Sequence, residues 1–440
     1  MKTPAIYLKR GREASLERFH PWIFSGAVAQ KRGAPAEGAV VDVYTADGNY
    51  VGTGHYQEGS IAVRILSFEG PGLPPDFWVE ALKKAYALRE RLGLCGESES
   101  CRESDRRSKT TAYRLVHGEG DHLPGLVIDY YQGVAVMQAH SAGIFMAKTE
   151  IAEALKTLYG KELLAIFDKS AGTAPFKAGL PLQNGYLFDA RHPSAASPLL
   201  GNDACNSLPS AASHDVEIDT CNSLPSAAFT VWENGYRYLP DWEEGQKTGF
   251  FLDQRENRAL LGQMASGARV LNLFCYSGGF SVSALGGGAE SVYSVDSSQR
   301  AVELLQQNVA MNFPSDNRHH AITADAFEFL KASPKGAYSL MVLDPPAFAK
   351  HTQAKKSALQ AYKRLNAIAL DRIASRGILF TFSCSQVVDK NEFTLSVFSA
   401  AAISGRKVRI LHRLGQAPDH PVNIFHPEGD YLKGLVLYVE

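Results

Sequence analysis

Several small and polar residues in the second half of the chain follow apolar segments, where α/β proteins commonly bind ligands. Val270–Phe274 has the pattern of a buried strand and runs into the pair Gly278-Gly279 and then a helical segment. Glycines at such a turn let the backbone pass close to a ligand. Asp296 ends the next predicted strand, where an acid commonly accepts hydrogen bonds from ribose hydroxyls. The turn lacks GxGxxG spacing, so it favours a smaller adenosyl ligand over a dinucleotide, with a purely structural tight turn as the alternative.

Two further acids follow the next predicted strands. Asp325 comes directly after Ala321–Ala324, where it could hold an adenine amino group or cap the following helix, and both roles can be true. Asp344 follows the strand Tyr338–Leu343 and precedes two prolines. Successive prolines fix φ and remove two donors, which makes a rigid, extended lip able to hold a planar base. Asp344 is therefore placed to touch that base, and a simple strand terminator is the alternative.

Cys384 lies between two serines at the end of the predicted strand Gly377–Phe382, on the same sheet edge as Asp344. A buried cysteine is usually a small hydrophobe. The flanking serines and the strand-end position favour a functional thiol at Cys384 instead. Cys275 sits inside the glycine turn, where packing is the better interpretation.

The elements that must position these residues alternate between strands and helices from about Thr248 to Glu440. Such alternation predicts an α/β fold with a mostly parallel, doubly wound sheet. Helical segments such as Gln299–Met311 and Ala361–Ser375 separate the strands. Lys407–Leu414 and Leu432–Val439 have no good helix between them and predict an antiparallel hairpin at the sheet edge.

The sequence divides into four stretches. Residues 1–72 predict a small β-rich domain with strands in Ala39–Tyr44, Tyr50–His55 and Ile61–Ser67. Residues 73–190 predict an α+β domain that opens with a helix capped by Asp76 and contains a helix at Ile144–Leu158. Residues 191–228 are a low-complexity insertion, in which CNSLPSAA occurs twice at a 16-residue step. Residues 229–440 form the domain that carries the candidate site.

Composition narrows the class of protein. The 440 residues are 45% hydrophobic and 21% charged, which is typical of a soluble globular protein and excludes global disorder. The net charge of −1 argues against a histone-like binder. No apolar run reaches the roughly 18 residues of a transmembrane helix. The first residues do not resemble a secretory signal, and the six cysteines form no CxxC pair, so we expect reduced thiols, a cytoplasmic location, no membrane partner and no metal site.

Taken together, the motifs resemble a family of bacterial class I S-adenosylmethionine-dependent methyltransferases that make 5-methylcytosine in 23S ribosomal RNA. Members of that family combine a PUA domain, an EEHEE domain and a Rossmann-like catalytic domain. The resemblance covers nearly the whole chain apart from the repeats. It rests on five stretches in the right order: Leu8–Glu13, His20–Phe24, Tyr113–Leu126, Lys247–Arg255 and Gly415–Pro421.

The resemblance implies S-adenosylmethionine as cofactor, 23S ribosomal RNA as partner, and Cys384 as nucleophile with Asp344 beside it. The Asp344-Pro345-Pro346 segment lacks the second cysteine that another group of RNA cytosine methyltransferases carries there, which implies a single-cysteine mechanism. The oligomeric state stays open, a homodimer included. The cofactor-binding residues that it implies are Phe251, Arg255, Phe274, Ser277, Gly278, Asp296, Asp325 and Asp344.

The N-terminal stretch carries basic residues interleaved with aromatic ones, which favours an RNA-binding surface. The alternative is a solvated face around a small core. The residues predicted to bind RNA are Lys9, Arg10, Arg12, Arg18 and Trp22.

Cytosine C5 is too weak a nucleophile to take a methyl group unaided, so the hypothesis requires the Cys384 thiolate to add to C6 first. Asp344 would support the charge that develops on the ring. The sequence does not identify the base that removes the C5 proton. Two alternatives remain: an RNA N-methyltransferase that needs no cysteine nucleophile, and a non-catalytic RNA-binding or assembly factor.

Overall fold

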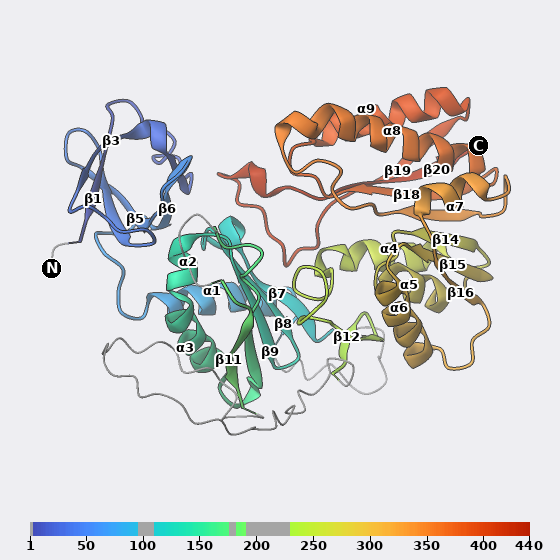
Figure 1. The fold of residues 1–440 in the computed structure, drawn as a ribbon, viewed down its shortest axis with the longest axis horizontal. Helices are drawn as coiled ribbons and strands as arrows, with labels where there is room; N and C mark the ends of the chain where they lie inside the picture. Colours follow the sequence, from blue (N-terminus) through green and yellow to red (C-terminus); the bar gives the residue numbers. More distant parts are fainter. Residues whose placement is uncertain (1–2, 96–109, 176–181, 191–228) are drawn as a thin grey trace, which may run out of the picture.

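The computed structural model describes residues 3–95, 110–175, 182–190 and 229–440, so the 16-residue repeats lie outside the described residues. Figure 1 shows the N-terminal domain in blue, the middle domain in cyan to green and the C-terminal domain in yellow to red. Among the described residues, no helix is both long and apolar enough to cross a membrane.

Six strands form the N-terminal sheet, in the order β2-β6-β5-β4-β1-β3. They are β1 (Ala5–Leu8), β2 (Trp22–Phe24), β3 (Val28–Arg32), β4 (Val40–Tyr44), β5 (Tyr50–Tyr56) and β6 (Ile61–Ser67). The sequence predicted β4, β5 and β6 but not the first three. Most residues of β3 face solvent, so this strand shows no apolar alternation from which it could be recognised.

The middle domain has a five-stranded sheet in the order β11-β10-β9-β8-β7. Its elements are α1 (Phe77–Arg91), β7 (Ala112–His117), β8 (Leu126–Tyr131), β9 (Val134–Ala139), α2 (Ala142–Met146), α3 (Lys148–Tyr159), β10 (Ala165–Asp168) and β11 (Gly185–Asp189). The single helix predicted at Ile144–Leu158 is wrong, because the chain forms two helices that meet at Ala147. The Ser141 side chain starts the first of them by accepting a hydrogen bond from the Ile144 amide.

The C-terminal domain is built on a seven-stranded sheet in the order β16-β15-β14-β17-β18-β20-β19. Its strands are β14 (Arg269–Leu273), β15 (Ser291–Asp296), β16 (His319–Thr323), β17 (Leu340–Leu343), β18 (Gly377–Ser383), β19 (Val408–Leu414) and β20 (Lys433–Val439). A hairpin of β12 (Val231–Glu233) and β13 (Tyr236–Tyr238) precedes it. Strands β14 to β18 pair in parallel, which confirms the predicted α/β class. Strands β19 and β20 form the predicted antiparallel pair, with β20 lying between β18 and β19.

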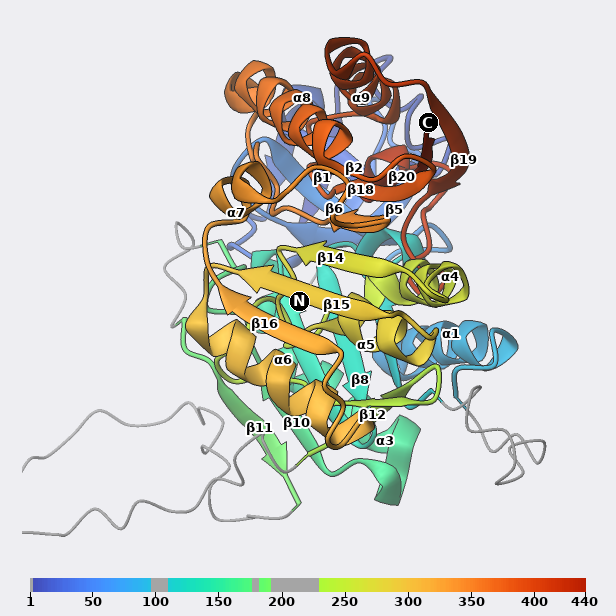
Figure 2. The same cartoon turned by 90° about the vertical axis from the view of Figure 1, so that its right-hand side faces the viewer.

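Helices cover both faces of this sheet because successive strand residues point to opposite sides. In β14, Val270 packs into one core with α4 (Arg255–Met264), α5 (Gly279–Gly286) and α6 (Gln299–Asn312). Leu271 and Leu273 pack into the other core with α7 (Ala326–Ala332), α8 (Lys355–Arg372) and α9 (Lys390–Ser404). Figure 2 shows α8 and α9 on one side of the sheet and α5 and α6 on the other.

The strand order places a topological switch between β14 and β17. From β14 the chain runs outward through β15 and β16, then returns to β17 on the opposite side of β14. In open α/β sheets, ligands bind in the crevice at the carboxyl ends of the strands beside such a switch. The four candidate segments after β14, β15, β17 and β18 all leave the sheet at this edge.

A loop between β19 and β20 fastens the C-terminal domain to the middle domain. Asp419, in this loop, is fully buried and accepts hydrogen bonds from the Arg114 amide and the Arg255 guanidinium, both at 2.9 Å. Burial alone would raise the pKa of Asp419, but the charge of Arg255 and the His420 ring beside it hold it well below its usual range. The Arg89 side chain of α1 donates to the Asp419 carbonyl at 2.6 Å. These bonds set the position of the segment that leads into β20.

Candidate active site

The turn after β14 has an unusual backbone conformation at the carboxyl end of the strand. Phe274 and Tyr276 adopt positive φ angles of 59° and 45°, and Gly278 has φ 82°. Non-glycine residues rarely hold such angles, and they cluster at ligand sites where the surroundings enforce them. Here Asp296, at the end of β15, accepts hydrogen bonds from the Tyr276 amide at 2.9 Å and the Ser298 amide at 3.0 Å. The glycine turn and the acid are therefore one unit.

The residues of this unit fit an adenosyl ligand. Asp296 is only partly buried, so its remaining lone pairs stay available to ribose hydroxyls. Phe274 is half-buried and lies 6.4 Å from the Phe327 ring, which provides an apolar face for a planar base. Phe251 packs on the Tyr276 ring at 5.2 Å, beside the same turn.

Three other predicted cofactor-binding residues have structural partners. Ser277 is buried, and its carbonyl accepts from the Asn308 side chain at 2.8 Å. The Asp325 side chain caps α7 by accepting from the Glu328 amide at 2.9 Å, which is one of its two predicted roles. Arg255 is 1% exposed and pairs with Asp419, and the cofactor contact predicted for it stays a prediction.

Asp344 leaves β17 beside the turn and is held by a side chain from another segment. The Gln254 amide nitrogen donates to its Oδ2 at 3.0 Å. Burial raises the pKa of Asp344 to about 7, and the negative charge of Asp253 adds to the effect, while the hydrogen bond from Gln254 opposes it. This carboxyl group can therefore carry a proton near neutral pH, which an ordinary aspartate does not.

Cys384 follows β18 and faces the same lip. Its Sγ lies 3.9 Å from the Pro345 carbonyl, and the register of β17 with β18 pairs Leu343 with Thr381. Burial raises the pKa of the Cys384 thiol to about 11, and the charges of Asp344 and Asp253 raise it further, whereas Lys247 opposes them. The structure thus brings the thiol and the Asp344-Pro345-Pro346 segment together.

Sequence reasoning missed four residues that surround this pair. Asp253 and Gln254 lie just before α4. Lys433 is the first residue of β20, and Tyr431 lies two residues before that strand. Lys433 is 3% exposed and donates to the Ser385 carbonyl at 2.6 Å. Burial lowers the pKa of Lys433 to about 8, although Asp430 and Cys384 act against this. A lysine that opens the otherwise apolar run KGLVLYV was the one signal for it in the sequence.

The predicted RNA-binding residues lie on the N-terminal domain, away from the strand ends. Lys9, Arg10, Arg12 and Arg18 are exposed, and Arg10 forms an ion pair with Asp47. Trp22 is half-buried, because its Nε1 donates to Glu119 of the middle domain at 2.9 Å. Trp22 thus contributes to the contact between these two domains, and its predicted contact with RNA stays a prediction.

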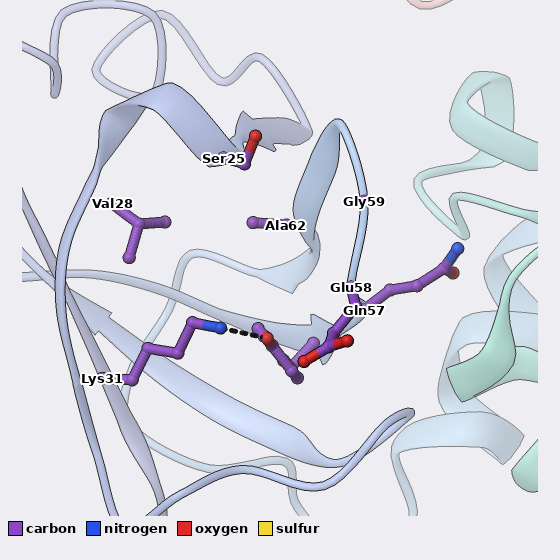
Figure 3. Close-up of a pocket in the computed structure, with 8 residues that line it drawn as sticks. Ser25, Val28, Lys31, Gln57, Glu58, Gly59 and Ala62 are labelled. Carbon is purple, nitrogen blue, oxygen red and sulfur yellow. Dashed lines mark hydrogen bonds between the residues drawn. The ribbon is translucent and has the colours of Figure 1, made fainter. Parts of the chain in front are cut away.

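Two cavities lie outside the Cys384 site. A cavity of about 290 Å³ in the N-terminal domain is lined by Lys31, Glu58 and neighbouring residues, as Figure 3 shows. The Lys31 amino group donates a hydrogen bond to the Tyr56 hydroxyl. A second cavity, of about 100 Å³, lies between Tyr276 and Arg300, next to the glycine turn. The strand-end position of Cys384 and the raised pKa of Asp344 make their surroundings the candidate chemical centre.

Comparisons with known proteins agree with this geometry. Residues 6–68 match the family of PUA-like domains, and residues 211–425 match S-adenosylmethionine-dependent methyltransferases. The chain is 36% identical over 438 residues to the ribosomal RNA large subunit methyltransferase I of Aeromonas hydrophila, with 98% of each chain covered. It is also 36% identical to the protein of the same name from Shewanella amazonensis, with 99% of each covered.

Solved structures show the same fold. One, from Streptococcus mutans and assigned as a SAM-dependent methyltransferase, has a TM-score of 0.74 at 21% identity with full coverage of both chains. Another assigned methyltransferase, solved in complex with SAH, has the same TM-score and identity. The predicted PUA-like and Rossmann-like architecture is thereby confirmed.

Proposed function

The chain belongs to the ribosomal RNA large subunit methyltransferase I family, and from that premise we propose that it makes 5-methylcytosine in 23S ribosomal RNA through a covalent adduct with Cys384. As a member of this family, it is an S-adenosylmethionine-dependent methyltransferase that acts on RNA of the large ribosomal subunit. The choice of cytosine C5 and the role of the thiol are the proposed part. The observation that carries them is a partly buried thiol beside a carboxyl group whose pKa is raised to about 7, at the topological switch of the sheet.

The residues divide between holding the cofactor and activating the base. The glycine turn, Asp296 and Phe274 would hold S-adenosylmethionine, which when bound supplies the electrophilic methyl group that an activated C5 accepts. Cys384 attacks C6 of the target cytosine, so that the C5–C6 double bond moves its electrons toward C5 and N3. Asp344, in its protonated form, donates a hydrogen bond to N3 and stabilises the charge that develops there.

The thiol must ionise when the substrate enters. With a pKa of about 11 it is almost fully protonated near neutrality, and the thiolate is the nucleophilic form. Two cationic side chains act on it: Lys247 lowers its pKa, and Lys433 lies on the strand next to β18, opposite Ser383. When Asp344 shares its proton with N3 of the bound cytosine, less negative charge remains beside Cys384 to oppose ionisation of the thiol. The resting enzyme is therefore protected from adventitious alkylation until a base is bound.

In this proposal the N-terminal domain binds the RNA. Its exposed cations Lys9, Arg12 and Arg18 can neutralise phosphates, and such contacts give a sequence-independent share of the affinity. The target cytosine has to be unpaired or flipped out to reach a crevice at the strand ends.

The test uses Cys384→Ala and an RNA substrate that carries 5-fluorocytosine at the target. The wild type should form a covalent protein–RNA complex that survives denaturing electrophoresis, because fluorine cannot leave C5 as a proton does. Cys384→Ala should form none and lose turnover, while Cys275→Ala, which alters a packed thiol, should still form the complex. Full methylation by Cys384→Ala would instead indicate transfer to a nitrogen atom, and absence of S-adenosylmethionine binding by the wild type would favour a non-catalytic factor.

A further inference from the structure

Methylation at C5 leaves one proton to be removed. After methyl transfer, C5 carries both the new methyl group and its original hydrogen, while C6 remains bonded to sulfur. A base must take that hydrogen as a proton so that the C5–H electron pair re-forms the C5–C6 double bond and the C6–S bond breaks, releasing the thiolate. None of the roles given above to Cys384 and Asp344 supplies this base.

Asp253 is held rigidly beside the site. It lies in a 3₁₀ turn, Leu252–Gln254, that precedes α4. Its Oδ2 accepts from the Tyr431 hydroxyl at 2.5 Å, and its backbone carbonyl accepts from the Ala417 amide at 2.9 Å. One carboxylate oxygen is thus fixed, which fixes the direction of the other.

The other oxygen, Oδ1, is buried and has no hydrogen-bond partner in the structure. Leaving a buried carboxylate oxygen unpaired costs free energy, and such groups in native proteins are commonly kept for a function. In the part of the chain that the structure describes, Asp253 is the one carboxylate of this crevice with a buried, unpartnered oxygen.

Hydrogen bonds connect the surroundings of Asp253 to both residues that act on the ring. On one side its neighbour Gln254 binds Asp344 at 3.0 Å. On the other side Tyr431 donates to Asp253 and lies two residues before Lys433 in the chain. Lys433 in turn donates to the carbonyl of Ser385, the residue after Cys384. The charge of Asp253 raises the pKa of both Asp344 and Cys384, as expected for a carboxylate that faces both.

We propose that Asp253 is the base that accepts the C5 proton on its free oxygen, an inference that rests on the proposed cytosine-C5 chemistry. The proton passes from C5 to Oδ1, the C5–H electrons form the double bond, and Cys384 leaves as the thiolate. Asp253 then returns the proton to solvent when the product departs. Tyr431 is a positioning residue, because its hydroxyl holds Oδ2 and so aims Oδ1.

The deciding variant is Asp253→Asn, assayed with methyl-tritiated S-adenosylmethionine and unmodified ribosomal RNA. The amide keeps the size and can still accept from Tyr431, but it cannot take a proton. We expect turnover to fall about 10²–10⁴-fold, the range for loss of a general base. Methyl transfer should still occur, so a protein–RNA complex that carries tritium should accumulate on denaturing gels. Glu256→Gln, an exposed position on the adjoining helix, is the matched control and should behave as wild type.

Parallel reactions on 5-fluorocytosine RNA test the cytosine-C5 chemistry separately from the assignment of Asp253 as the base. If the wild type forms no covalent complex with that RNA, the proposed cytosine chemistry itself is wrong. Two results would overturn the assignment of Asp253 as the base while leaving Cys384 as the nucleophile. In one, Asp253→Asn forms the complex with fluorinated RNA but accumulates no tritiated complex on ordinary RNA. In the other, Asp253→Asn turns over ordinary RNA at the wild-type rate. Tyr431→Phe should give a smaller, partial accumulation with an unchanged KM for S-adenosylmethionine, and wild-type kinetics would contradict its positioning role.

Discussion

Replacing Asp344 by Asn should make the protein more stable at alkaline pH, although it removes a residue of the active site. Burial, and then the charge of Asp253, raise the pKa of Asp344 from 3.8 to about 7 in the folded protein. Below about pH 4 the carboxyl group is protonated in both states. Between pH 4 and 7 the unfolded chain releases its proton and the folded chain keeps it, so stability falls as the pH rises and becomes constant above pH 7.

The magnitude follows from the shift. About 3 pKa units at 1.36 kcal/mol each correspond to about 4 kcal/mol. Because Asp344 stays partly exposed, solvent screening reduces this to about 2 kcal/mol at pH 8 and about 0.8 kcal/mol at pH 5. An asparagine has no charge to desolvate and still accepts the hydrogen bond from Gln254. The stability gap in favour of Asp344→Asn should therefore grow by about 1.2 kcal/mol between pH 5 and pH 8.

Thermal melts of the two proteins at pH 5 and pH 8 measure this gap. With roughly 2–4 °C per kcal/mol for a domain of this size, the difference in Tm should widen by about 2–5 °C. Glu256→Gln serves as an exposed acid-to-amide control, for which we expect no widening. The reasoning is refuted if the wild type and Asp344→Asn show parallel pH dependence. The same variant should alkylate faster at Cys384, because removal of a like charge within a few ångströms lowers a pKa by about 1 unit or more.

Three further outcomes follow from the site. Asp296→Asn should weaken S-adenosylmethionine binding about tenfold in isothermal titration, because a charged acceptor for the ribose is lost; an unchanged Kd would contradict the role of Asp296. Lys433→Met should slow the modification of Cys384 by iodoacetamide, because removal of a nearby cation raises the pKa of the thiol. Peptide mass spectrometry measures the rate, and a rate equal to that of the wild type would show that Lys433 does not act on the thiol. Gly278→Ala should lower the Tm and the cofactor affinity together, because its Cβ would lie 1.9 Å from Leu305 Cδ1 at φ 82°, which costs about 1–3 kcal/mol; a normal melt would count against the strained turn.

Much of the C-terminal fold could be predicted from local pattern. Ser291–Asp296 is a strand with the predicted bounds, and Gln299–Met311 lies within α6, which ends one residue later. These elements have strong apolar periodicity and clear caps, such as Ser298 at the start of α6. The glycine turn, Asp296, Asp344 and Cys384 could be placed at one sheet edge because carboxyl ends of parallel strands share that edge. The domain boundaries at residues 72 and 190 stay a prediction.

Other elements gave no local signal. The hairpin β12–β13 has strands of three residues each, and β11 (Gly185–Asp189) is only partly buried, so neither carries a periodic pattern. Arg255 was assigned to the cofactor from a resemblance of its segment. The structure pairs it with Asp419, 164 residues later in the chain, and its cofactor contact stays a prediction. Short elements and buried ion pairs depend on partners that sequence spacing does not reveal.

By itself, the order of residues determined which groups can react and at which edge of the sheet they gather, since strand periodicity and strand-end position are local properties. Only the tertiary structure decided the pKa values of those groups and which neighbouring side chains form hydrogen bonds with them. Asp344 receives Gln254 from 90 residues away, and Asp253 receives Tyr431 from 178 residues away. The physical reason is that pKa values and free lone pairs depend on burial and charge within a few ångströms, and the folded chain sets those distances without regard to separation along the sequence.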